Sequence, residues 1–176
     1  MFGIVVGSPA AHAPAAMITF SRFSRRVLPI LMLLPLFSQA QVGKVLTVVP
    51  GVYFHEGDVG RKGHCNHGWI VFDDFVLVID GNFPSGAQEI IPKIKAVTTQ
   101  PIRFVMDTHH HGDHAYGNQV WHELGATPVA HSGVLAEMKR FETGFFGGQP
   151  GRWEDTAKGR PDVAASKLKP PTVLFE

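Results

Sequence analysis

The chain has 176 residues, enough for one hydrophobic core and short of two comfortable domains. Its 44% hydrophobic and 18% charged residues are ordinary for a globular protein and speak against disorder. The formal net charge is +1, and without the three basic residues of the first forty, 13 Lys and Arg stand against 15 Asp and Glu. No basic stripe remains, so we expect no nucleic-acid partner.

The first forty residues have the pattern of a secretory leader. Basic residues come first, then the apolar run 27–37, and Ser38-Gln39-Ala40 supplies the small-x-small pattern of a cleavage site. The basic residues are Arg22, Arg25 and Arg26. A membrane anchor is the alternative, but the apolar run is much shorter than the roughly 20 residues that span a bilayer.

We therefore predict a signal peptide over residues 1–40 and a partial domain over residues 41–176. The mature protein would be exported, to the periplasm or as a secreted protein, with no stable membrane span after leader removal. Met17 is a more natural first residue for such a leader, so residues 1–16 are a candidate for a wrongly assigned N-terminal extension.

Short apolar runs in the first half of the domain predict strands. Residues 45–55 are rich in Val, Leu and Tyr around Pro50-Gly51, which indicates one or two strands around a turn. Residues 57–63 are glycine-rich and charged and indicate a loop. Residues 69–72 and 75–79 indicate two largely buried strands joined by a two-residue turn.

The next segment predicts a helix. Ser85 with Gln88 makes a capping box, and apolar residues follow at helical spacing as far as Val97. Pro92 is a fault in this interpretation, because a proline past the first turn kinks a helix or delays its start.

The second half of the domain alternates strands and helices. Residues 102–106 form an apolar run that predicts a buried strand, and the segment after Asp113, residues 114–124, should be helical, with Gly125 as the stop. The glycine-rich, polar stretch 144–170 has no predicted element. Three further elements are a strand, an amphipathic helix and a last strand, at residues 127–130, 132–141 and 172–175. The alternation predicts an α/β architecture with a mixed sheet in one layered domain.

A histidine cluster follows the strand predicted at residues 102–106, and it runs Thr108-His109-His110-His111-Gly112-Asp113-His114. Zinc and similar cations are held by neutral imidazole and carboxylate, and a catalytic site leaves one position for water. On an extended loop His109 and His111 point the same way and can reach one ion. Asp113 and His114 lie where the chain turns into a helix and suit a second ion. Two ions side by side lower the pKa of water and polarise a carbonyl or phosphoryl oxygen, which predicts hydrolysis.

A solvated histidine loop or a non-catalytic metal store is the alternative for this cluster. Three features oppose it: the preceding strand is apolar, Asp113 stands at a fixed spacing, and a helix follows. The His110 side chain would point away from those of its neighbours, so we expect it to support the site and not to bind the metal directly.

The pattern His109-x-His111-x-Asp113-His114 resembles the signature of the metallo-β-lactamase superfamily. Residues 66–71 and 78–81 resemble the paired strands that lead to an aspartate near the metals of that family. Residues 101–105 resemble its strand before the motif, and Gly117-Asn118 its helix after it. The resemblance covers roughly residues 45–142 and implies a four-layer αββα sandwich.

By this resemblance His109 and His111 hold the first metal, and Asp113 and His114 hold the second. Asp113 would also shuttle a proton to the leaving group. The implied cofactor is Zn²⁺, two ions per complete site, with iron or manganese as alternatives.

The chain departs from the family downstream of the motif. Family members complete the site with a third histidine, a bridging aspartate and a last histidine, whereas after His114 this chain has only His122 and His131. We expect His122 on a helix surface and His131 without a ligand role. The sequence thus resembles the N-terminal αβ half, with the C-terminal half missing. Because ligands are missing, we expect weak metal binding and poor catalysis. Because half of the sandwich is missing, we expect an exposed sheet face and edge that favour self-association.

Other candidate residues precede the motif. His64, Cys65 and His67 include metal-ligand types, but a glycine-rich loop near the mouth of the site is the favoured interpretation. Asp80, at the end of a predicted strand, is either a partner of a metal histidine or a turn residue.

The leading hypothesis is a zinc-dependent hydrolase that acts on an ester, thioester or lactam-like bond of a small molecule. The alternatives are an iron-dependent enzyme of oxygen or persulfide chemistry on the same scaffold, and a non-enzymatic metal- or partner-binding module. In the glycine-rich stretch, an aromatic pocket wall and a core patch are comparable interpretations of Phe145, Phe146 and Trp153.

Overall fold

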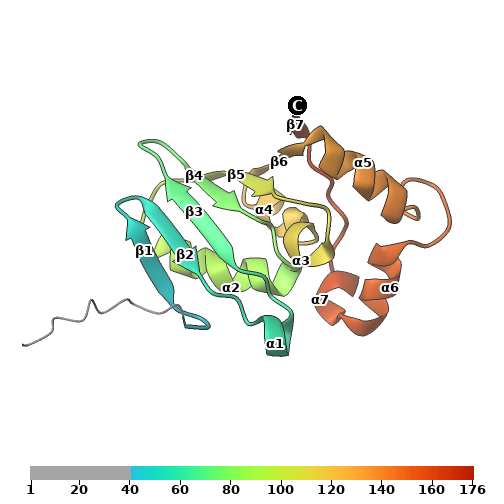
Figure 1. Cartoon of the computed structure of the whole chain (residues 1–176), viewed down its shortest axis with the longest axis horizontal. Coiled ribbons are helices and arrows are strands. Elements are labelled where there is room, and N and C mark those ends of the chain that lie inside the picture. The colour runs from blue at the N-terminus through green and yellow to red at the C-terminus, as the bar shows by residue number, and fades with distance from the viewer. Residues whose placement is uncertain (1–40) are drawn as a thin grey trace, which may run out of the picture. The chain divides into compact units, whose positions relative to one another are not determined.

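A seven-stranded mixed sheet organises the chain (Figure 1). The computed structural model describes residues 41–176, so the predicted leader lies outside the described residues. The strands lie side by side in chain order, with antiparallel pairing up to the fourth strand and parallel pairing after it. The α/β prediction with a mixed sheet is confirmed. The strands are β1 (Val45–Val49), β2 (Val52–His55), β3 (His67–Val71), β4 (Val76–Ile79), β5 (Ile102–Asp107), β6 (Thr127–His131) and β7 (Val173–Phe175).

Helices connect the parallel strands. They are α2 (Pro84–Lys95), α3 (Gly112–Ala115), α4 (Asn118–Glu123), α5 (Ser132–Phe141), α6 (Arg152–Gly159) and α7 (Pro161–Ala164), and α1 (Val59–Lys62) precedes β3. The main core forms where α2 and α4 meet one face of the sheet, and Trp69, Ile90, Val105 and Trp121 are fully buried there. Within residues 41–176 no helix is both long and apolar enough to cross a membrane.

The helix predicted from Ser85 begins one residue earlier, and the capping box with Gln88 is wrong. Pro84 occupies the first helical position, where a proline costs no backbone hydrogen bond, and no side chain caps the helix. The Ser85 hydroxyl instead donates to Asp162 Oδ2 over 2.6 Å. The helix continues through Pro92. The Ser85 hydroxyl, which local spacing had predicted to cap the helix, is therefore hydrogen-bonded to Asp162, a residue far along the chain.

Two other local predictions are corrected. The stretch 57–63 was predicted as a loop but contains α1, which Asp58 caps by accepting a hydrogen bond from the Arg61 amide over 3.1 Å. The single helix predicted after the histidine cluster is two helices, α3 and α4. They are separate because the Gly117 amide donates to the Asn82 carbonyl oxygen, 2.6 Å away, instead of continuing the helical ladder.

Helices α6 and α7 lie in the polar stretch where no element was predicted. Glu154 accepts a hydrogen bond from the Gly151 amide over 2.7 Å and so stabilises the start of α6. Apolar residues are few, but Val163 and Leu168 are buried against Tyr116 in a second core. Periodicity missed these helices because so few of their residues face that core.

The second face of the sheet is apolar but not buried, and we call it the open sheet face. Its side chains are uncharged and half-buried or exposed, whereas a solvated sheet face ordinarily carries polar residues. Cross-strand pairing places on it Leu46, Val52, Phe54, Ile70, Leu77, Ile79, Phe104, Met106, Val129, Val173 and Phe175.

Candidate metal centre

The four predicted ligands lie together beyond the C-terminal end of β5. The centroid of the His109 ring is 4.7 Å from that of His111 and 4.0 Å from that of His114. Oδ2 of Asp113 lies 3.3 Å from Nε2 of His114. The loop after β5 carries the first two histidines, and the first turn of α3 carries the other two ligands. Local chain geometry therefore makes the four residues neighbours. The group of three ligand atoms that the described residues bring within 4.8 Å of one another is a different one, formed by Cys65, Asp80 and His114.

Asp80 ties this loop to the end of the neighbouring strand β4. Its φ of 67° lies in the left-handed region, which non-glycine residues rarely adopt. Oδ1 accepts hydrogen bonds from the Thr108 amide and hydroxyl, both at 2.8 Å. Oδ2 lies 3.0 Å from Nδ1 of His114, an ion-pair contact without hydrogen-bond geometry. Of the two interpretations left open for Asp80, the structure supports the partner of a metal histidine.

Two carboxylates flank His114 and favour its charged form. Burial favours the neutral ring, but the contacts with Asp113 and then Asp80 prevail and raise the pKa of His114 to about 12. The pKa of Asp113 is lowered, first by its contact with His114. Burial works to raise the pKa of Asp80, yet its contacts with His114 and Thr108 lower it overall. Metal binding at this ring would therefore release a proton.

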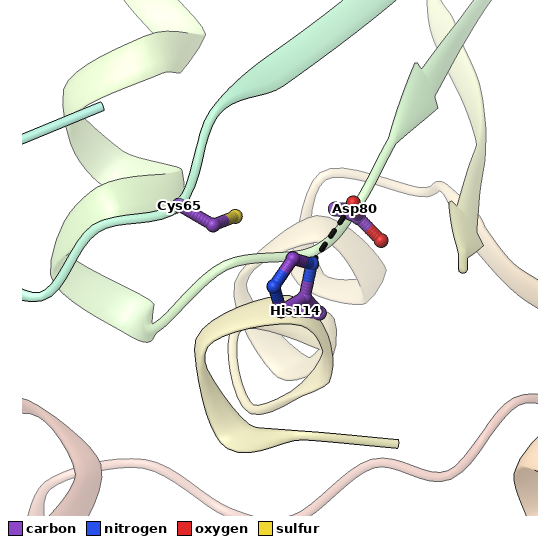
Figure 2. A group of neighbouring side chains, drawn as sticks. All are labelled: Cys65, Asp80 and His114. Atoms are coloured by element: carbon purple, nitrogen blue, oxygen red, sulfur yellow. Dashed lines mark ion pairs between the residues drawn. The ribbon is translucent and has the colours of Figure 1, made fainter. Parts of the chain in front are cut away.

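Cys65 lies beside Asp80 and His114, as Figure 2 shows, and one ligand atom from each of the three is within 4.8 Å of the others. The cysteine comes just before β3, which pairs with β4, so its loop reaches the end of β4 where Asp80 stands. Burial raises the pKa of the Cys65 thiol. Sulfur, carboxylate and imidazole are all zinc ligands, so His114 belongs to two overlapping donor sets. The sequence did not reveal this contact because the three residues are far apart along the chain.

The histidines outside the predicted ligand set have other contacts. His110 stacks on Phe141 with ring centroids 5.2 Å apart. His122 is exposed on α4, as predicted. Nδ1 of His131 accepts a hydrogen bond from the Gly133 amide over 3.0 Å and so caps α5. These contacts give the three residues structural or surface roles.

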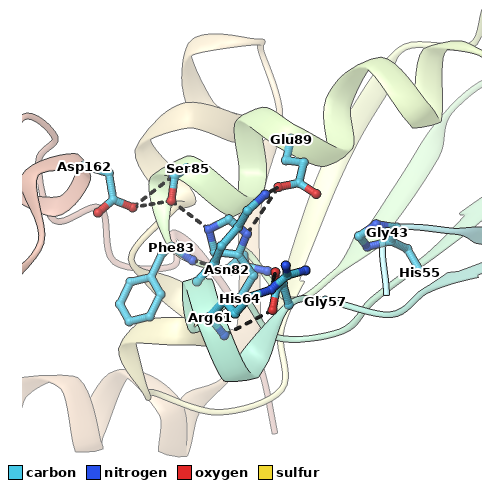
Figure 3. Close-up of polar contacts among 12 residues, drawn as sticks. Gly43, His55, Gly57, Arg61, His64, Asn82, Phe83, Ser85, Glu89 and Asp162 are labelled. Carbon is cyan, nitrogen blue, oxygen red and sulfur yellow. Dashed lines mark hydrogen bonds and ion pairs between the residues drawn. The ribbon is translucent and has the colours of Figure 1, made fainter. Parts of the chain in front are cut away.

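His64 and His67 are buried supports of the loop before β3 and not side chains of an open loop. His64 belongs to the polar network drawn in Figure 3, where its Nε2 lies 2.8 Å from the Ser85 hydroxyl oxygen. His67 is the first residue of β3, and its Nδ1 lies 3.4 Å from the Asn82 amide nitrogen. The sequence interpretation placed these residues near the site but missed their burial.

A cavity of about 370 Å³ adjoins the predicted ligands. Trp153, one of the aromatic residues with two open interpretations, packs on Tyr116 in the second core, with ring centroids 4.8 Å apart. Phe145 and Phe146 are 49% and 39% exposed. The lining of the cavity includes residues of the metal loop, of α3 and of α6: His111, Asp113 and Arg152.

Comparison with protein families decides the ancestry of the chain. The family model described as the metallo-beta-lactamase superfamily matches residues 60–174, more than half of the sequence. The chain belongs to this superfamily. Comparison with curated protein sequences gave no match.

Solved metallo-beta-lactamases resemble this member of the superfamily. A structure from Hirschia baltica has 19% identity and a TM-score of 0.51, covering 76% of this chain and 52% of its own. One from Pseudomonas aeruginosa in a mono-zinc form has 20% identity and a TM-score of 0.47, covering 55% and 45%. One from Cronobacter sakazakii has 21% identity and a TM-score of 0.47, covering 57% and 36%. The chain spans about half, or less, of the length of these structures.

The donor set of this superfamily member fits a zinc ion. Three imidazoles and one carboxylate are the nitrogen and oxygen ligands that zinc prefers. His109, His111, Asp113 and His114 would hold the metal.

Proposed function

We propose that this chain carries the metal-binding part of a zinc-dependent hydrolase that acts on an ester, thioester or lactam-like bond of a small molecule. The observation that carries the proposal is the gathering of three imidazoles and the Asp113 carboxylate beside a cavity of about 370 Å³. Membership of the superfamily supports it.

The residues of the site would have different roles in metal binding and proton transfer. Zinc, when bound, would polarise the carbonyl of the scissile bond and lower the pKa of water. His109 and His111 would hold one ion. Asp113 and His114 would hold a second, with Asp80 fixing the orientation of the His114 ring. The Asp113 carboxylate would also take up a proton and deliver it to the leaving group.

For this chain by itself we propose metal binding with low activity. Within residues 41–176, His110 apart, no further histidine lies against the four ligands, since His122 is exposed and His131 caps α5. A zinc site with few protein ligands loses affinity and control over the bound substrate. Full activity would therefore need ligands beyond these four.

Zinc titration by calorimetry tests the ligand assignment. The wild-type chain should bind zinc, and His109→Ala or His111→Ala should weaken binding by at least about tenfold, because each removes a direct ligand. His122→Ala, on the exposed face of α4, is the matched control and should bind as the wild type does. Equal affinity in all variants would refute the assignment.

Hydrolysis of a chromogenic ester by the zinc-loaded chain tests the reaction. Its rate should rise with zinc occupancy, and Asp113→Asn should lower kcat by at least about a hundredfold, because it removes both a metal ligand and the proton-transfer group. A chain purified with stoichiometric iron and little zinc would contradict the choice of metal.

We also propose that the chain is exported. The support is the order of basic residues, apolar run and small residues within residues 1–40. Mass measurement of the periplasmic product should show cleavage after Ala40. An uncleaved product in the cytoplasm would contradict it.

A further inference from the structure

Arg152 projects into the cavity that adjoins the predicted metal ligands. It is the first residue of α6, and its guanidinium carbon lies 3.8 Å from the centroid of the Phe141 ring. The same ring stacks on His110, next to the metal-binding loop. Stacking on an aromatic face orients a guanidinium plane while leaving its N–H groups free to bind a ligand.

The guanidinium of Arg152 has no carboxylate partner among residues 41–176. The acidic side chains around the cavity have other partners. Glu142 accepts hydrogen bonds from the Tyr116 hydroxyl and the Trp153 amide, both at 2.6 Å. Asp155 lies 2.7 Å from the ammonium of Lys158. Arg152 therefore forms no ion pair within the described residues, and its guanidinium N–H groups remain available to a ligand in this cavity.

Helix electrostatics do not explain this position. A cation at the first residue of a helix meets the positive end of the helix dipole and gains nothing from it. Arg140 also contacts Phe141, with its guanidinium carbon 5.1 Å from the ring centroid, but it pairs with Glu137 and does not line the cavity. Arg152 and Arg140 thus share an aromatic contact and differ in access to the cavity.

We propose that Arg152 binds an oxyanion group of the substrate, so that the hydrolase prefers acyl compounds that carry a carboxylate or a phosphate. The planar guanidinium offers paired donors that match either group. His111 and Asp113 line the same cavity, which places the bound anion beside the bond to be cleaved. The assignment of a substrate class rests on the proposed hydrolase function, whereas anion binding by Arg152 does not.

Anion binding is measured on the metal-free full chain by NMR titration with succinate and, separately, with inorganic phosphate. The indole N–H of Trp153, next to Arg152, should shift, while the fully buried indoles of Trp69 and Trp121 serve as references. Arg152→Gln should abolish the shift, and Arg140→Gln should retain it. A shift with either anion supports the oxyanion site and identifies the preferred group. No shift with both anions, or an equal shift in Arg152→Gln, overturns the proposal.

Substrate specificity is measured as the rate at which the zinc-loaded chain hydrolyses two esters. Nitrophenyl acetate is neutral, and the nitrophenyl monoester of succinate carries a carboxylate. Arg152→Gln should lower kcat/KM for the charged ester by about tenfold and leave the neutral ester within about twofold. Arg152→Lys should fall between, because it keeps the charge and loses the paired donors. Equal losses for both esters would assign a purely structural role to Arg152 and overturn the proposal. If neither ester is hydrolysed, the proposed function fails, and the anion titration still decides on the site.

Discussion

His67 shows how one buried side chain couples this domain to pH. It is the first residue of β3 and only 2% exposed, and its Nε2 has no hydrogen-bond partner within the described part of the chain. Burial, and then the nearby His55, lower the pKa of His67 from 6.5 to about 3. The folded state therefore holds a neutral ring at a pH where the unfolded chain would take up a proton.

Acidification should destabilise the protein through His67. Because its folded pKa lies below the unfolded value of 6.5, its contribution to stability is complete above that pH and is lost as the pH falls toward 3. Between about pH 7.5 and about pH 5.5 the wild type should lose about 1 kcal/mol more of its free energy of unfolding than His67→Gln does. Urea denaturation at both pH values measures the difference. The exposed His122→Gln should behave as the wild type, and parallel losses in wild type and His67→Gln would contradict the prediction.

At the scale of elements, a polar network fastens α7 to the rest of the domain. Oδ2 of Asp162 accepts hydrogen bonds from the Ser85 amide and hydroxyl on α2, at 3.1 and 2.6 Å (Figure 3). Arg160 contacts the same carboxylate, donates to the Lys62 carbonyl oxygen over 2.8 Å and lies over the Phe83 ring. This network holds the α6–α7 segment, which supplies one wall of the cavity.

Removal of the Asp162 carboxylate should loosen that segment. Asp162→Ala should lower the free energy of unfolding by about 1–2 kcal/mol, because two donors of Ser85 lose their acceptor in a partly buried place. Chemical denaturation measures this loss. Asp155→Ala, which removes only the exposed contact with Lys158, is the control and should change little. An equal effect of the two substitutions would show that the network does not stabilise the fold.

At the scale of the whole molecule, the open sheet face is the surface through which we expect self-association. Its side chains are apolar on all seven strands apart from Thr127 and His131 on β6, yet none of them is buried. Contact of such a face with water is unfavourable, at roughly 25 cal/mol per Å² of apolar surface. Self-association of the chain would cover part of this surface.

A charge in the middle of this face should weaken self-association. Leu77 lies on the central strand β4 and is half-buried, so Leu77→Lys can reach water in the monomer while opposing contact between two apolar sheets. Sedimentation velocity over a range of concentrations should show less association for Leu77→Lys than for the wild type. Gln88→Lys, exposed on α2, adds the same charge elsewhere and should leave association unchanged. A wild type that stays monomeric at all concentrations would contradict the expectation.

Strands β1 to β7 followed from the pattern of apolar residues, because each strand is short and its neighbours in the sheet are also its neighbours in the chain. The metal ligands followed from type and spacing within one short segment. Ser85 was wrongly predicted to cap α2, and α6 was missed, for a shared reason: distant contacts, with Asp162 and with the second core, decide both.

By itself, the sequence determined the α/β class and the superfamily resemblance and predicted the ligand set His109, His111, Asp113 and His114, since all of these depend on local pattern. Only the tertiary structure showed that Asp80 and Cys65 lie beside His114 and that Arg152 lines the cavity. Asp80 and Cys65 meet His114 because β3, β4 and β5 lie next to one another in the sheet. Arg152 reaches the cavity because α6 packs beside the metal loop. Contacts between residues far apart in sequence depend on chain packing, which local spacing does not encode.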